Sequence, residues 1–173
     1  GYCGGDVTGS YVLMLPCLSW YDKNYVRGLQ QEWIDRLEKV PNGVIASPLE
    51  DMGREDDAAM LQYWKRFPGT VYGYTRERVN RAAQVDPQQL KIEMDKMLLE
   101  HSDAIRILYH CWGTKPIMEG STCTGVVFES KEGRKAIIAK QVIDATGDLD
   151  LCRQTGGKTS SLASENARSS HTA

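Results

Sequence analysis

Apolar residues recur at steps of three and four positions in two parts of the chain, which predicts two amphipathic helices. The first stripe runs through residues 24–40 and stops at the Pro-Asn-Gly run 41–43. The second begins at Asp86-Pro87, a capping residue followed by proline at the first helical position, and continues to residue 100. Each helix is expected to bury its apolar face against the rest of the fold.

Alternation of apolar and polar positions predicts strands in five further segments. These segments are residues 11–15, 104–110, 112–118, 122–130 and 134–143. The last three are separated by short polar turns, so we expect them to form an antiparallel meander. The second predicted helix leads directly into the strand at 104–110, an order typical of half a βαβ unit.

The pattern between residues 47 and 73 is poor, and we interpret about 21–85 as a largely helical insert. An acidic cluster lies there, which we expect to form a solvated face: Glu50, Asp51, Glu55, Asp56 and Asp57. Aromatic residues follow it: Tyr63, Trp64, Phe67, Tyr72 and Tyr74. These aromatic side chains could line a substrate cavity, but packing beneath a long loop is the commoner arrangement.

Composition is that of a soluble globular domain. The length of 173 residues favours a single domain, with 41% apolar and 25% charged residues. The 21 basic side chains are scattered among 23 acidic ones, which argues against a nucleic-acid partner. No apolar run approaches the roughly eighteen residues that cross a bilayer, and no export signal is visible. Ser and Thr dominate residues 158–173, where we expect a disordered tail.

The cysteines indicate neither a disulfide framework nor a metal site. Five of them lie at wide spacings, without a CxxC pair or a histidine at ligand spacing: Cys3, Cys17, Cys111, Cys123 and Cys152. Scattered thiols are typical of a reducing compartment, so a cytoplasmic location is expected. We predict no metal site, and the three histidines (His101, His110 and His171) suggest no catalytic role.

Four motifs in this order resemble one enzyme family. They are Gly4-Gly5 with Thr8–Ser10, the Asp86-Pro87 cap, Thr124–Val127 (Thr-Gly-Val-Val), and Val142–Asp148 (Val-Ile-Asp-Ala-Thr-Gly-Asp). The chain thereby resembles FAD-dependent oxidoreductases related to fumarate reductase flavoprotein subunits, which are flavoproteins with two dinucleotide-binding domains. The resemblance covers about residues 1–157. It implies an α/β, partial FAD/NAD(P)-binding (Rossmann-like) fold that carries the three-stranded meander and the helical insert.

The resemblance also implies the residues that hold FAD. They are Gly4, Gly5, Thr8, Ala145, Thr146, Gly147 and Asp148. Small residues at the end of a parallel strand leave room for a ligand, and a Gly-Gly loop offers backbone N–H groups to phosphate or ribityl oxygens. An alternative for Asp148, and for Asp150, is that the carboxylate caps a short helix at Leu151. No catalytic acid or base is indicated.

One part of the family pattern is absent. The family begins with a strand, a G-x-G-x-x-G turn, a helix and a second strand, and none of these occurs here. Because the chain also begins at Gly1, we expect an interior fragment whose single domain spans 1–157. FAD would then bind once the missing segment completes the site, and the sequence leaves open whether this chain alone binds FAD or holds no cofactor.

Three functions remain open at this point. The chain is part of an oxidoreductase that passes hydride between FAD and a small organic substrate, with the flavin performing the chemistry. Alternatively, it is a non-catalytic module whose open sheet edges pair with a second copy or a complementing subunit. The third possibility is a truncated product without activity of its own.

Overall fold

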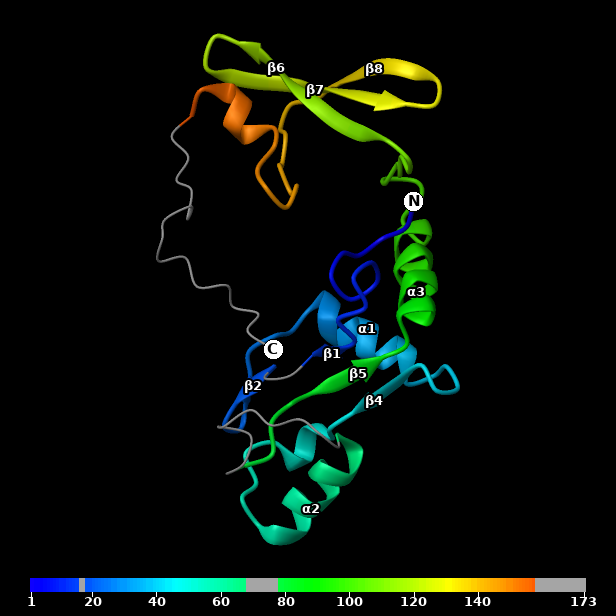
Figure 1. Ribbon diagram of the computed structural model, residues 1–173, viewed down its shortest axis with the longest axis vertical. Helices are drawn as coiled ribbons and strands as arrows, with labels where there is room; N and C mark the ends of the chain where they lie inside the picture. Colours follow the sequence, from blue (N-terminus) through cyan, green and yellow to red (C-terminus); the bar gives the residue numbers. More distant parts are fainter. Residues whose placement is uncertain (16–17, 68–77, 158–173) are drawn as a thin grey trace. The chain divides into compact units, whose positions relative to one another are not determined.

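The computed structural model describes residues 1–15, 18–67 and 78–157 (Figure 1). The chain divides into two compact units, Gly1–Ile107 and Leu108–Ala173, which we call unit 1 and unit 2. Each unit is described by itself. The expected single domain over 1–157 and its insert stay predictions, and the expected disordered tail at 158–173 lies outside the described residues.

Two small antiparallel sheets form in unit 1. The larger has the order β1-β5-β4, with β1 at Met14–Leu15, β5 at Ala83–Val85 and β4 at Val44–Ala46. The smaller pairs β2 (Ser19–Trp20) with β3 (Lys23–Asn24). The predicted strand at 11–15 is therefore confirmed only in its last two residues, which pair with β5.

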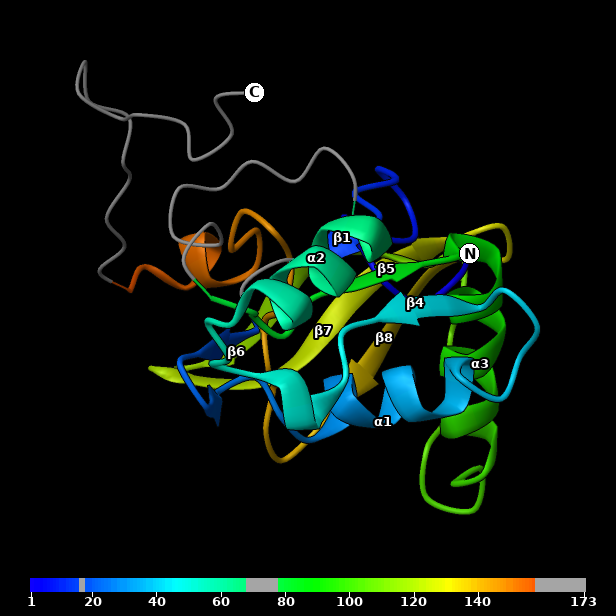
Figure 2. The ribbon, with the colours of Figure 1, turned by 90° about the horizontal axis from the view of Figure 1, so that it is seen from below.

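Both predicted helices form in unit 1. The first, α1 (Leu29–Leu37), is shorter at both ends than the apolar stripe suggested, since it starts after Gly28, whose φ of 69° is not helical. The second, α3 (Pro87–Leu99), begins as predicted, because the Asp86 carboxylate accepts hydrogen bonds from two backbone N–H groups at 2.9 and 2.8 Å. These two helices contact each other (Figure 2).

A buried cluster joins the two helices to the larger sheet. Leu37 of α1, Val85 of β5, and Leu90 and Met94 of α3 pack together in it. Leu37 is fully buried, and Leu90 is 1% exposed. Burial of these side chains fixes the face that each helix turns inward.

The predicted meander forms in unit 2. Its sheet has the order β6-β7-β8, with β6 at Trp112–Glu119, β7 at Thr122–Ser130 and β8 at Gly133–Ile138. Both pairings are antiparallel. The glycine of the Thr-Gly-Val-Val motif, Gly125, has a packing reason, because a Cβ there would lie 2.3 Å from the Ile137 carbonyl oxygen. A short 3-10 helix, η3 (Cys152–Thr155), follows the meander.

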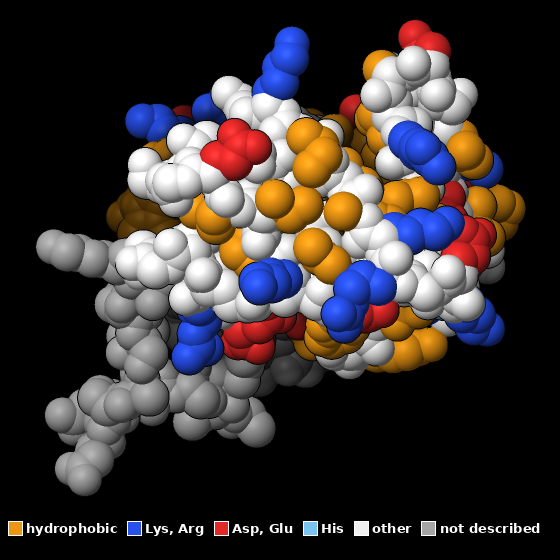
Figure 3. All heavy atoms as spheres, turned by 90° about the horizontal axis from the view of Figure 1, so that it is seen from above, with side chains coloured by type: hydrophobic (Ala, Val, Ile, Leu, Met, Phe, Trp, Pro, Cys, Tyr) orange, Lys and Arg blue, Asp and Glu red, His pale blue; other side chains and the backbone are white. Residues whose placement is uncertain are grey.

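The sheet of unit 2 leaves apolar side chains exposed (Figure 3). All six residues of β8 are exposed. Among the described residues of the unit, the most exposed large apolar side chains are those of Trp112, Ile138 and Ile143, at 71%, 71% and 89%. A three-stranded sheet with this much open apolar surface has little core of its own.

Two strand predictions need correction. No strand forms at 104–110, and β8 ends at Ile138 instead of 143. A strand forms only where a row of its N–H and C=O groups meets a neighbouring strand. Past Ile138 the Ala139 N–H still donates to the Thr124 carbonyl at 2.9 Å, but neither segment forms a strand ladder among the described residues. The predicted half of a βαβ unit is therefore not formed. The described chain combines helices with small antiparallel sheets, which is compatible with an α/β fold.

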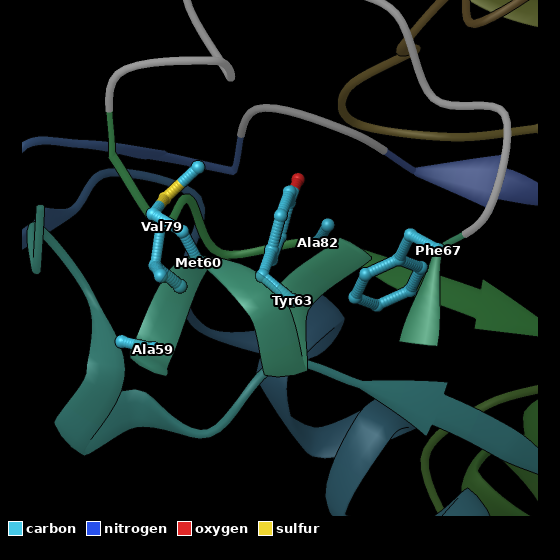
Figure 4. Packing of buried hydrophobic residues seen from close by; sticks show 6 residues of the cluster. All are labelled: Ala59, Met60, Tyr63, Phe67, Val79 and Ala82. Atoms are coloured by element: carbon cyan, nitrogen blue, oxygen red, sulfur yellow. The ribbon is translucent and has the colours of Figure 1, made fainter. Parts of the chain in front are cut away.

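The aromatic residues of the predicted insert pack into a core. Helix α2 (Asp57–Arg66) carries Tyr63, which packs with Phe67 and four further residues, Ala59, Met60, Val79 and Ala82 (Figure 4). Trp64 packs against this cluster. Tyr63, Trp64 and Phe67 thus pack against other side chains, whereas their cover by a long loop stays a prediction. Tyr72 and Tyr74 lie outside the described residues.

The acidic cluster beside α2 is mainly a solvated face, as expected. Glu50, Glu55, Asp56 and Asp57 are exposed. Asp56 also caps α2, since its side chain accepts a hydrogen bond from the Ala59 N–H at 3.0 Å. Within the described ranges, no helix has the length and apolar character needed to cross a membrane.

Candidate cofactor-binding turns

The first candidate site is the glycine-rich loop at the start of unit 1. Backbone hydrogen bonds close it, from the Gly9 N–H to the Gly5 carbonyl at 2.7 Å and from the Ser10 N–H to the Asp6 carbonyl at 3.1 Å. Thr8 is fully buried, and its hydroxyl donates to the Cys3 carbonyl at 2.9 Å. The Thr8 side chain therefore braces the loop from inside.

The structure of the loop requires glycine at position 4 but not at position 5. Gly4 has a φ of 105°, and a Cβ there would lie 1.9 Å from the Thr8 hydroxyl oxygen. Gly5 has neither constraint, since a Cβ there would meet no atom within 4 Å. The N–H groups of Gly4, Gly5 and Asp6 donate to no partner in the described part of the chain. They are the donors that a phosphate or ribityl oxygen could use.

Replacing Gly4 with alanine is expected to destabilise unit 1. Alanine at this position would have to keep the positive φ, and its Cβ would collide with the Thr8 hydroxyl. The free energy of unfolding should therefore fall by about 1–3 kcal/mol. Denaturant unfolding followed by far-UV circular dichroism measures the change. The matched variant, Gly5→Ala, should stay within about 0.5 kcal/mol of the original chain. Equal losses in both variants would contradict the distinction between the two glycines.

The second candidate site is the turn after the meander, which Asp144 organises. Its Oδ1 accepts from the Thr146 hydroxyl at 2.6 Å and from the Thr146 N–H at 3.0 Å. Its Oδ2 accepts from the N–H groups of Leu151 and Cys152, at 3.1 and 2.8 Å. The Thr146 hydroxyl oxygen in turn accepts from the Asp150 N–H at 2.8 Å. One carboxylate thus ties the turn to the start of η3.

These hydrogen bonds govern the acidity of two groups. The Thr146 hydroxyl, followed by the Cys152 N–H, holds the pKa of the Asp144 carboxyl well below its usual range. Hydrogen bonds to the ionised form favour that form. The Asp144 carboxylate also raises the pKa of the Cys152 thiol, because it accepts from the protonated side chain and repels the thiolate. Asp144 is therefore an anion over the ordinary pH range.

The residues beside Asp144 leave their backbone open to solvent. Ala145, Gly147 and Asp148 are exposed. Their N–H groups donate to no partner among the described residues. A Cβ at Gly147 would meet no atom within 4 Å. Packing within the chain therefore does not require glycine at this position.

The alternative that Asp148 or Asp150 caps the short helix near Leu151 was wrong. Asp144 fills that role, as the acceptor for the first N–H groups of η3, whereas Asp148 and Asp150 are exposed. Asp144 was also missing from the predicted site residues. A local signal for it existed, because an Asp two residues before a Thr can accept that Thr's N–H and hydroxyl.

The two turns belong to different units: Gly4, Gly5 and Thr8 to unit 1, and the residues 145–148 to unit 2. A cradle shared by both turns stays a prediction. In the described ranges, no group of three or more His, Cys, Asp or Glu side chains is arranged to hold a metal ion.

Comparison with known proteins identifies the family. A family model described as FAD dependent oxidoreductase matches residues 1–170. Neither the curated proteins nor the solved structures contain a significant match. The match covers nearly the whole chain, and it includes both glycine turns, the meander and the Asp86-Pro87 helix. This chain belongs to the FAD dependent oxidoreductase family.

Proposed function

We propose that this chain supplies part of the FAD site of an oxidoreductase that passes hydride between the flavin and a small organic substrate. The two turns would hold the nucleotide through backbone N–H groups, one set around Gly4-Gly5 and the other at 145–148. The family match implies the cofactor, and the chemistry of the turns suits it.

One observation carries the proposal. A Cβ at Gly5 or Gly147 would meet no atom of the described residues within 4 Å, and neither residue has a positive φ. Neither the backbone conformation nor the packing of the described chain therefore accounts for glycine there. Close approach of a ligand to the main chain is the remaining common reason for a glycine in a turn.

The chain's own residues would bind and orient the cofactor, while bound flavin supplies the hydride chemistry. Unpaired N–H groups at both turns would donate to phosphate, ribityl or ring oxygens. The Asp144 carboxylate would keep the second turn in one conformation, because four donors already saturate it. Its negative charge is thereby offset before an anionic nucleotide approaches.

The proposal includes a Rossmann-like sheet of the fumarate reductase flavoprotein type. Residues 141–146 precede Gly147 without regular pairing, and Ile143 is 89% exposed. An apolar residue of this kind fits a strand that is buried once a parallel neighbour lies beside it. The turn at 145–148 would then lie at the carboxyl edge of that sheet, where open α/β folds bind ligands.

Titration with FAD tests the proposed site. Quenching of flavin fluorescence should show saturable binding, and Gly5→Val or Gly147→Val should weaken it by at least about tenfold, or roughly 1.4 kcal/mol. Neither variant should lose stability, because a Cβ at either position meets no described atom within 4 Å. Far-UV circular dichroism checks that both variants remain folded.

The control adds the same side chain outside the turns. Gln141 is exposed, and Gln141→Val should leave the FAD affinity unchanged within about twofold. Absence of flavin binding by the unmodified chain, or equal affinities for all three variants, would contradict the proposed role of the two turns.

We also propose a second function, pairing of unit 2 with another protein chain. Both β6 and β8 are edge strands of their sheet, and Ile138 on β8 is 71% exposed. An exposed edge with apolar side chains is a template for strand pairing. Light scattering separates the two functions, since a colourless, stable dimer supports pairing and a flavin-binding monomer supports the FAD site.

A further inference from the structure

We infer that unit 1 holds a binding pocket for a neutral, mainly apolar small molecule. The pocket has a volume of about 400 Å³ and lies between α1, α3 and the glycine loop. Sites for small ligands commonly have volumes of about 300–1,000 Å³. Gly4 of the glycine loop borders the pocket, but the ligand class is argued below from side chains of α1 and α3 that are not part of the proposed FAD site.

Apolar and polarisable side chains line most of this pocket. Trp33 contributes from α1, and Met94, Met97 and Leu98 contribute from α3. An indole ring offers a flat surface for stacking, and unbranched methionines adapt to the shape of a ligand. A one-ring or two-ring aromatic molecule fits such a lining better than a strongly hydrated ion does.

The charges at the mouth of the pocket exclude one class of ligand. Two carboxylates stand there, those of Glu32 and Glu100, with side chains 45% and 51% exposed. The Arg36 guanidinium binds both, at 2.8 and 2.7 Å. Glu32, Glu100 and Arg36 together carry one net negative charge, and the His101 side chain also lines the pocket. Because Arg36 is already paired, it is not available to an anionic ligand.

The geometry therefore favours neutral molecules over carboxylates. An anion entering the pocket would lose its hydration against apolar side chains and would meet a like charge at the mouth. A dicarboxylate has two such anionic groups, so its binding is disfavoured more strongly than that of a monocarboxylate. If the pocket receives the substrate of the proposed oxidoreductase, that substrate is neutral and largely apolar.

A pair of ligands with the same ring system tests the inference. Isothermal titration calorimetry of the 173-residue chain without FAD should show saturable binding of 1-naphthol, and 1-naphthoate should bind at least about tenfold more weakly. Leu98→Trp fills the pocket and should weaken 1-naphthol binding at least about tenfold. The matched control is Leu99→Trp, which adds the same ring at a position 62% exposed and should leave binding unchanged within about twofold.

A second variant keeps the test informative if Leu98→Trp does not fold. Glu100→Gln removes the net charge at the mouth, so 1-naphthoate should bind several-fold more tightly while 1-naphthol binding stays the same. Equal affinities for the two ligands, no saturable binding of 1-naphthol, or equal losses in Leu98→Trp and Leu99→Trp would overturn the inference. Release of 1-naphthol by dimer formation would also overturn it, because a second copy would then occupy the pocket. FAD affinity is measured separately, so failure of one proposal leaves the other standing.

Discussion

Replacing Leu37 with alanine is expected to lower the free energy of unfolding of unit 1 by about 2–5 kcal/mol. The Leu37 side chain is fully buried, and its cluster joins α1 to β5 and α3 through Val85, Leu90 and Met94. Removing it costs the transfer free energy of the lost methyl groups and leaves a cavity. Such a loss is a large part of the 5–15 kcal/mol that stabilises an ordinary domain.

Denaturant unfolding followed by far-UV circular dichroism measures this effect, because α1, α2 and α3 all lie in unit 1. The control is Leu61→Ala on α2, where the side chain is 54% exposed, and its change should stay within about 0.5 kcal/mol. A Leu37→Ala loss as small as that of the control would mean that the cluster does not hold the helices to the sheet.

Replacing Asp144 with alanine is expected to unfold the second turn locally. The variant loses the acceptor for the N–H and hydroxyl of Thr146 and for the N–H groups of Leu151 and Cys152. Donors left without a partner destabilise the structure that holds them. Amide hydrogen exchange should therefore speed up at Leu151 and Cys152, and the affinity for FAD should fall if the proposed site is correct.

The control for this variant is Asp148→Ala, which removes an exposed acid from the same turn. Exchange at the Leu151 and Cys152 amides should not change in it. A second measurement follows the Cys152 thiol, whose pKa is raised by the Asp144 carboxylate. Without that carboxylate, reaction of Cys152 with a thiol reagent at neutral pH should accelerate. Unchanged exchange and unchanged thiol reactivity in Asp144→Ala would refute the assigned role.

The low pKa of Asp144 predicts that the stability of unit 2 depends on pH. Because the pKa of Asp144 is depressed in the folded chain, its contribution to stability is fully present above the unfolded pKa of about 3.9. The contribution declines as the pH falls below that value toward the folded pKa, since the unfolded chain then binds the proton more readily. Asp144→Asn should remove this part of the acid sensitivity.

Local chemistry explains which features the sequence predicted correctly. The start of α3 follows from Asp86, whose carboxylate caps the next turn, and from Pro87, whose ring favours the first helical position. The meander follows from alternating residues and a tight turn before Gly133, which has a φ of 94°. These signals involve neighbours in sequence, so no distant contact was needed to recognise them.

The errors arose where a distant partner decides the outcome. Residues 104–110 have the alternation of a strand but form none, because pairing requires a neighbour that the described chain does not supply. Asp144 was predicted only as part of the motif that follows the strand at 134–143, although two of its donors lie seven and eight residues further on. The pattern could not reveal how far that carboxylate reaches.

By itself the sequence determined where α1 and α3 form, where the turns of the meander lie, and the four motifs that indicated the family. Tertiary structure alone decided the order β1-β5-β4, the packing of Tyr63 against Val79 and Ala82, and the apolar pocket between α1 and α3. The reason is physical: caps and turns depend on a few adjacent residues, whereas a sheet order or a pocket depends on which distant surfaces meet.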